Sequence, residues 1–175
     1  ASFSEHYIES VEDLTKLFRY EYLNHFGFDN TRQQFIPILI GAVDNAYTRQ
    51  VMDQFFHKIK KIIYIDSGNE SVKVPKDWQN RPINHWTEEE IKEYKESGWS
   101  GQVVCGVKML NYYPPPLASV YPAILYDKDS VKPSSLSCSE LSASEPQRVI
   151  VNKFAALAVA NYINDIIEEH RVINH

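Results

Sequence analysis

The chain has 175 residues, with 18 basic and 23 acidic side chains, a formal net charge of −5 and a pI near 5.7. This length suits one medium-sized domain, and the negative charge argues against general binding to nucleic acids or anionic membranes, which require a positive field. The two cysteines are too few for a disulfide framework and favour a reducing compartment, so we expect a cytoplasmic protein. The six glycines never cluster, which excludes a glycine-rich phosphate loop within this sequence.

The N-terminal part predicts a short strand followed by a helix. Residues 3–8 have strand-like composition, and Ser10 and Asp13 have the spacing of a helix N-cap. Apolar residues then recur at helical spacing until Gly27, where we expect the helix to stop.

The longest apolar run, residues 35–43, is far too short to cross a bilayer. We expect a central strand covered on both faces, as in a parallel sheet. An amphipathic helix follows through Val51, Phe55 and Ile59, and residues 62–66 predict a second buried strand. Strand, helix and strand together predict a right-handed βαβ unit.

The second half departs from this alternation. Residues 71–97 are polar and contain one helix, which Thr87 and Glu90 begin as a capping box, so we expect an insertion on the rim of the sheet. Residues 101–110 predict a further strand, and the proline-rich residues 112–122 an extended loop. A long helix is expected over residues 145–168, and its apolar middle indicates burial against the sheet or against a second subunit.

Asp44 and Asn45 directly follow the first buried strand, at the edge where open α/β sheets bind ligands. A carboxylate there can hold a magnesium ion against the phosphates of a nucleotide. Arg49, one helical turn later, can clamp a phosphate or brace the aspartate. In the alternative interpretation, Asp44 and Asn45 only cap the next helix.

Three short elements follow one another in the order Asp44-Asn45-x-x-x-Arg49, Asp66-Ser67-Gly68 and Gly98-x-x-Gly101-Gln102. This order resembles the ThiF/MoeB family of ubiquitin-activating-like (E1-like) adenylyltransferases. The resemblance implies an α/β fold with a Rossmann-like, mostly parallel sheet and flanking helices. It also implies that residues 1–175 form a single domain without its N-terminal glycine-loop half, because the family's loop precedes the matched segment. We therefore expect the chain to be the later portion of a longer protein.

By this resemblance, Asp44 would coordinate the magnesium ion of ATP, Asn45 would lie beside the nucleotide and Arg49 would support the site. The C-terminal carboxylate of a ubiquitin-like or sulfur-carrier protein would attack the α-phosphate of ATP, giving an acyl-adenylate and pyrophosphate. Cys138 is placed like a cysteine of some sulfur-carrier-activating members and would accept the acyl group, unless it is an incidental loop cysteine. The resemblance also implies a homodimer. No structural zinc is expected, because the chain lacks Cys-x-x-Cys pairs.

Two other functions remain open. The chain would be a catalytically inactive subunit that dimerises and docks a ubiquitin-like partner, or another Rossmann-like enzyme such as a nicotinamide oxidoreductase. The second of these is weaker, because it does not explain the first and third sequence elements together.

Overall fold

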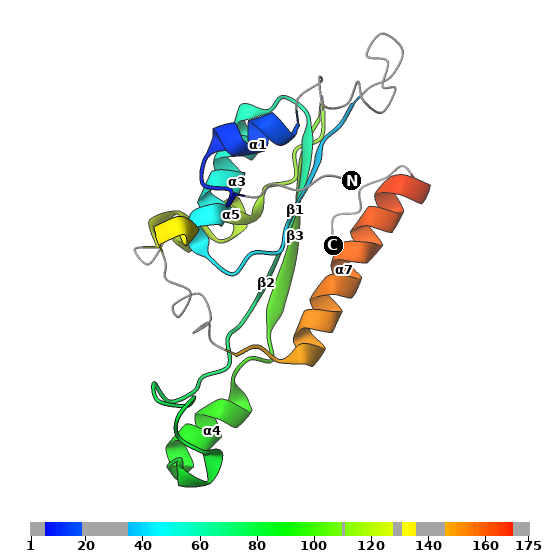
Figure 1. Cartoon of the computed structure of the whole chain (residues 1–175). Helices are drawn as coiled ribbons and strands as arrows, with labels where there is room; N and C mark the ends of the chain where they lie inside the picture. Colours follow the sequence, from blue (N-terminus) through cyan, green and yellow to red (C-terminus); the bar gives the residue numbers. More distant parts are fainter. Residues whose placement is uncertain (1–5, 19–34, 110, 128–130, 136–145, 170–175) are drawn as a thin grey trace. The chain divides into compact units, whose positions relative to one another are not determined.

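The computed structural model describes residues 6–18, 35–109, 111–127, 131–135 and 146–169 (Figure 1). Its main elements, in chain order, are α1 (Val11–Leu17), β1 (Ile38–Gly41), α3 (Ala46–Lys58), β2 (Ile62–Asn69), α4 (Glu88–Glu96), β3 (Gly101–Lys108), α5 (Leu117–Val120) and α7 (Val149–Glu168). Short 3-10 helices occur at Ile83–His85, Pro122–Tyr126 and Pro133–Ser135. The chain divides into two compact units. The first unit holds the described residues among 1–66 and 104–137, and the second unit holds those among 67–103 and 138–173.

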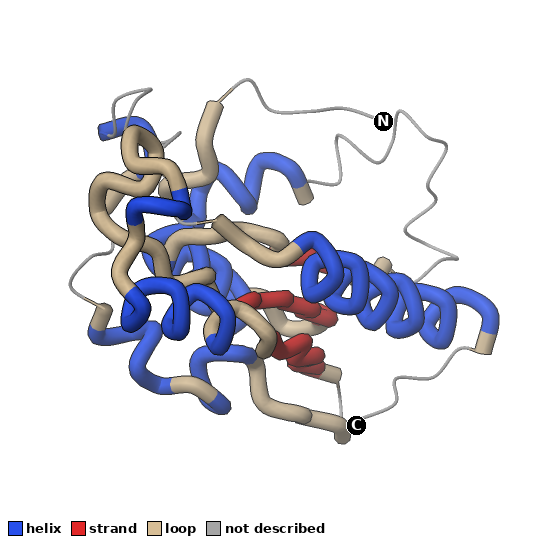
Figure 2. Tube along the Cα trace, turned by 90° about the horizontal axis from the view of Figure 1, so that it is seen from below, coloured by secondary structure: helices blue, strands red, loops and turns tan. Residues whose placement is uncertain are grey.

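The three described strands form one sheet in the order β1-β2-β3, drawn in red in Figure 2. Strands β1 and β2 are parallel, with Leu39 opposite Tyr64 and Gly41 opposite Asp66. The predicted strand–helix–strand order is confirmed over β1, α3 and β2, and the chain is of the mixed α/β class. The expectation of a mostly parallel sheet is met only by the β1–β2 pair among the described strands.

Within the described ranges, strand β1 is not the central, covered strand that its apolar run predicts. Among the described strands β2 occupies the middle, and Ile40 of β1 is 42% exposed. Strand β2 also continues as far as Asn69, three residues beyond the predicted strand, so Ser67 and Gly68 lie within it. An apolar run shows that a strand is buried somewhere, but strand order depends on contacts between distant segments.

The core of the first unit lies between α1, α3 and the sheet. Helix α3 buries Val51, Met52, Phe55 and Phe56, which pack with Leu14 of α1 and with residues of β1 and β2. The predicted cap of α1 is confirmed, because the Ser10 hydroxyl accepts a hydrogen bond from the Asp13 amide. The strand predicted over residues 3–8 is wrong for residues 6–8, and residues 1–5 lie outside the described ranges.

The proline-rich segment packs along β3 in the first unit. The Val107 amide donates to the Pro114 carbonyl at 3.0 Å, and Gly106 faces Pro116 so closely that a Cβ there would lie 2.6 Å from the Pro116 Cα. The segment is not entirely extended, because Leu117 and Ala118 lie buried in the short helix α5. The segment is therefore a packed connector.

The second unit contains the insertion between β2 and β3, whose helix α4 begins with the predicted capping box of Thr87 and Glu90. Gly98 follows the helix with φ of +75°, a left-handed conformation that favours glycine. Arg148, just before α7, donates hydrogen bonds to the carbonyls of Tyr94 and Ser97 and lies 3.9 Å from the centre of the Trp99 ring. These contacts attach the start of α7 to the end of the insertion.

Of the two kinds of burial predicted for the long helix, burial within this chain is wrong for most of α7, and burial against a second subunit stays a prediction. Only Tyr162 is buried, whereas Phe154 and Leu157 are each 65% exposed and Ile150 is 48% exposed. The apolar composition of the helix therefore exceeds what this chain itself covers. None of the helices in the described ranges combines the length and the apolar character that a membrane crossing requires.

Candidate functional site

The candidate site lies in the short connection between β1 and α3. Strand β1 ends at Gly41 and helix α3 begins at Ala46, so the connection contains Asp44 and Asn45. Because β1 and β2 are parallel, this connection lies at the carboxyl edge of the pair. That edge is where ligands bind in open α/β sheets.

Asn45 and Asp44 have different roles in this connection. The Asn45 side-chain oxygen accepts a hydrogen bond from the Thr48 amide at 2.8 Å, so Asn45 is the N-cap of α3. The predicted capping role is therefore confirmed for Asn45, and its predicted contact with the nucleotide stays a prediction. The Asp44 side chain is exposed, and no hydrogen bond or ion pair within the described residues involves its carboxylate.

Arg49 braces the connection from within. Its Nε donates to Asp66 Oδ1 at 3.1 Å, and its Nη2 donates to the Val43 carbonyl at 2.6 Å. The Arg49 side chain is 15% exposed and that of Asp66 is fully buried. Arg49 thus braces the Val43–Asp44 peptide and not the Asp44 carboxylate that the sequence predicted it to brace, and a clamp on phosphate stays a prediction.

Asp66 is held on its other oxygen by Tyr64, which the sequence interpretation did not include in the site. The Tyr64 hydroxyl donates to Asp66 Oδ2 at 2.6 Å. Burial raises the pKa of Asp66, while the hydrogen bonds from Tyr64 and Arg49 oppose that rise. Burial and the nearby Asp66 carboxylate also raise the pKa of Tyr64. The spacing of Tyr64 and Asp66 was the available signal, because residues two apart on a strand lie on the same face.

A second carboxylate, Asp53 of α3, is buried nearby in the first unit. The residue is 7% exposed, its Oδ1 atom has no hydrogen-bond partner, and its Oδ2 atom lies 3.6 Å from His57 Nε2. Burial raises the pKa of Asp53, and the proximity of His57 lowers it. Asp53 is therefore a poorly satisfied buried acid.

The structure describes one of the two cysteines. Cys138 lies outside the described residues, and Cys105 is a buried core thiol whose pKa burial raises to about 12. Among the described residues, no three His, Cys, Asp or Glu side chains are grouped to hold a metal ion. Magnesium is nevertheless commonly held by only one or two carboxylates together with substrate phosphates, so Asp44 alone fits a magnesium–nucleotide complex.

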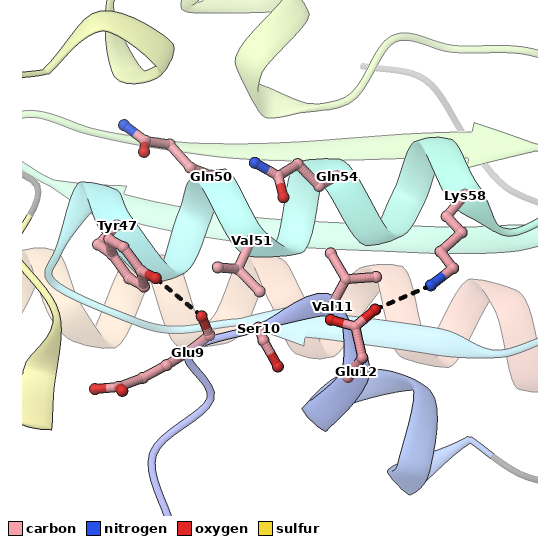
Figure 3. Close-up of a pocket in the computed structure, with 9 residues that line it drawn as sticks. All are labelled: Glu9, Ser10, Val11, Glu12, Tyr47, Gln50, Val51, Gln54 and Lys58. Atoms are coloured by element: carbon pink, nitrogen blue, oxygen red, sulfur yellow. Dashed lines mark hydrogen bonds and ion pairs between the residues drawn. The ribbon is translucent and has the colours of Figure 1, made fainter.

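A hollow of about 480 Å³ lies between the start of α1 and one face of α3 (Figure 3). The lining residues are Glu9, Ser10, Val11, Glu12, Tyr47, Gln50, Val51, Gln54 and Lys58. Within it the Tyr47 hydroxyl donates to the Glu9 carbonyl at 2.9 Å, and Lys58 donates to Glu12 at 3.4 Å. Neither Asp44 nor Arg49 lines this hollow, so it is separate from the candidate site.

The fold and the site define a mixed α/β protein with an exposed carboxylate on a braced loop at the end of a parallel strand. Comparison of the chain with protein-family models, with curated proteins and with solved structures finds no match. A functional assignment therefore depends on the sequence elements and on the geometry around Asp44.

Proposed function

We propose that the full-length protein uses ATP and magnesium to adenylate the C-terminal carboxylate of a ubiquitin-like or sulfur-carrier protein. The observation that carries this proposal is the exposed Asp44 carboxylate, which is presented by a braced loop at the carboxyl edge of parallel strands. The order of the sequence elements containing Asp44, Asp66 and Gly98 supports it. In this proposal the described strands belong to a Rossmann-like sheet in a cytoplasmic protein.

The contacts of each residue indicate its role in the proposed reaction. Asp44 would hold the magnesium ion, which when bound neutralises phosphate charge. Asn45 keeps the first turn of α3 in place, and Arg49 keeps the Val43–Asp44 peptide in place. The carrier's carboxylate oxygen would form a bond to the α-phosphorus of ATP as the bond from that phosphorus to the bridging oxygen breaks, releasing pyrophosphate. Cys138 stays a proposed acceptor of the acyl group.

The test is exchange of labelled pyrophosphate into ATP by the complete gene product, with ubiquitin-like and sulfur-carrier proteins as substrates. We expect Asp44→Ala to lower the exchange rate roughly a hundredfold, the usual size of a lost electrostatic contact at a reacting phosphate or carbonyl. Glu88→Ala, which removes an exposed carboxylate from α4, is the matched control and should leave the rate unchanged. Wild-type protein that exchanges no pyrophosphate with any of these carriers would contradict the proposal, as would equal rates for both variants.

A binding function without catalysis is the second candidate, and the exposed apolar side of α7 favours it. Ile150, Phe154 and Leu157 recur at helical spacing and are each at least 48% exposed. In this candidate α7 contacts a second copy of the chain or a ubiquitin-like partner. Phe154→Glu should then abolish the association measured by analytical ultracentrifugation, while Asp44→Ala leaves it intact. Adenylation that depends on Asp44 would favour the enzyme.

A further inference from the structure

A chain of hydrogen bonds leads from the interior of β2 to the backbone beside Asp44. Tyr64, which is 1% exposed, donates to Asp66 Oδ2 at 2.6 Å. The other Asp66 oxygen accepts from Arg49 Nε at 3.1 Å, and Arg49 Nη2 donates to the Val43 carbonyl at 2.6 Å. That carbonyl belongs to the peptide group joining Val43 to Asp44. The chain of contacts therefore ends on the backbone that carries the candidate magnesium ligand.

The surroundings of Asp66 leave its side chain little freedom. Gly41 lies opposite Asp66 in the parallel ladder, and a Cβ at position 41 would lie 2.2 Å from Asp66 Oδ2. Met52 Sδ is 3.7 Å from the Tyr64 hydroxyl and closes the other side. Each carboxylate oxygen of Asp66 thus has a definite donor, and the missing side chain of Gly41 provides the space for the carboxylate.

In such a hydrogen-bonded arrangement, the position of one group constrains the position of the next because each group is held rigidly. Hydrogen bonds to charged groups are shorter and stronger than neutral ones, and burial strengthens them further. The planar guanidinium of Arg49 makes its two bonds in a fixed relative direction, so the Val43 carbonyl is placed with respect to Asp66. Because Tyr64 fixes the carboxylate, it also fixes the guanidinium.

We propose that Tyr64 and Asp66 are positioning residues, which hold Asp44 in place for a magnesium-bound nucleotide through Arg49 and the Val43 carbonyl. The identity of the ligand rests on the proposed function, whereas the mechanical coupling from Tyr64 to the Val43–Asp44 peptide does not. Neither residue touches the nucleotide in this proposal.

The first measurement is amide hydrogen exchange of residues 43–45 in the complete gene product. Tyr64→Phe removes one hydroxyl and keeps the ring that fills the core. We expect exchange at these amides to accelerate about tenfold, the equivalent of one hydrogen bond to a charged group. Tyr47→Phe is the matched control, because its hydroxyl bonds the Glu9 carbonyl at 2.9 Å and takes no part in the chain of contacts. Equal exchange in the two variants would overturn the proposal.

The second measurement separates positioning from general loss of structure. In the pyrophosphate exchange assay, Tyr64→Phe should raise the KM for magnesium-ATP several-fold with little change in kcat, whereas Tyr47→Phe should change neither. If the wild type shows no pyrophosphate exchange, the proposed function fails. Amide hydrogen exchange still decides whether Tyr64 is coupled to the Val43–Asp44 peptide. If Tyr64→Phe does not fold, Arg49→Lys should accelerate exchange at residues 43–45, because a single ammonium group cannot reproduce the fork. Unchanged exchange in that variant would overturn the coupling.

Discussion

The corner between β1 and α3, which carries Asp44, and the insertion over residues 71–97, which carries α4, each contain an arginine paired with a carboxylate. The two pairs lie in different environments. At the corner, Asp66 is fully buried beside Arg49, with a hydrophobic core around them. In the insertion, Arg81 pairs with Glu90 at 2.5 Å and with Asp77 at 3.0 Å, and α4 has no buried residue. Loss of one partner should therefore cost much more at the corner, where the other partner stays buried, than in the insertion, where water and salt already weaken the pair.

The strongest test of this difference is Asp66→Ala. The variant leaves the Arg49 guanidinium and the Tyr64 hydroxyl without their shared acceptor in a buried site. Loss of one partner of a buried pair costs about 3–5 kcal/mol, and we expect a loss of that size in the free energy of unfolding, measured with urea. Asp44→Ala is the same substitution at an exposed position in the same unit and should change the free energy by about 0.5 kcal/mol or less. Equal losses of stability in the Asp66→Ala and Asp44→Ala variants would show that the buried pair contributes no more than an exposed side chain.

Gly41→Ala should produce the next largest effect. The added Cβ would lie 2.2 Å from Asp66 Oδ2 and 3.2 Å from Met52 Sδ, so a carboxylate held by two donors would have to move. Overpacking of this kind costs about 1–3 kcal/mol. In a double-mutant cycle measured by urea unfolding, the variant with both Gly41→Ala and Asp66→Ala should lose less stability than the two single losses added together. The reason is that Asp66→Ala removes the carboxylate with which the new Cβ clashes. Simple additivity would show that Gly41 strains something other than Asp66.

In the insertion, Thr87→Ala should have a smaller and local effect. The Thr87 hydroxyl accepts from the Glu90 amide, and loss of an N-cap costs about 1 kcal/mol of helix stability. We expect faster amide hydrogen exchange in α4 and unchanged exchange in α3. Glu88→Ala, one residue later and outside the capping box, should leave α4 nearly as protected as in the wild type. Faster exchange in α3 would mean that the insertion is coupled to the corner.

The smallest expected effect is a pH response of opposite sign in the two regions. Hydrogen bonds from Arg81 and Thr87 lower the pKa of Glu90 to about 2, so its stabilisation is present above pH 4.5 and is lost as the pH falls toward 2. Burial raises the pKa of Asp53 above its ordinary value of 3.8, so its contribution to stability is lost as the pH rises through the folded pKa.

Two measurements check these signs. Protection of α4, corrected for intrinsic exchange rates, should fall with acidification from pH 4.5. Asp53→Asn should be more stable than the wild type in urea at pH 7, with the difference shrinking on acidification. A difference that grows as the pH falls would contradict the sign assigned to Asp53.

Local chemistry in the sequence predicted the beginnings of α1 and α4 and the strands β1 and β2, but it also predicted a strand that residues 6–8 do not form. Ser10 and Thr87 each cap a helix through a contact three residues away, and such contacts form wherever the helix forms. The position of Asp44 at the end of a buried strand was also predictable from the apolar run before it. Asn45 caps α3 through its bond to Thr48, and the ligand contact predicted for it stays a prediction.

The contacts between residues that are distant in sequence were decided by the tertiary structure alone. Arg49 and Asp66 are 17 residues apart in sequence, and they meet because β1 and β2 pair in a register that places Asp66 beside the start of α3. The apolar composition of α7 predicted burial, yet most of its side chains are exposed, since composition shows that a helix has an apolar side but not which segment covers it. The sequence by itself thus determined the local elements and the place of Asp44 between β1 and α3. The fold determined that Arg49 links the buried Asp66 carboxylate to the Val43 carbonyl beside Asp44, because only strand pairing brings these residues together.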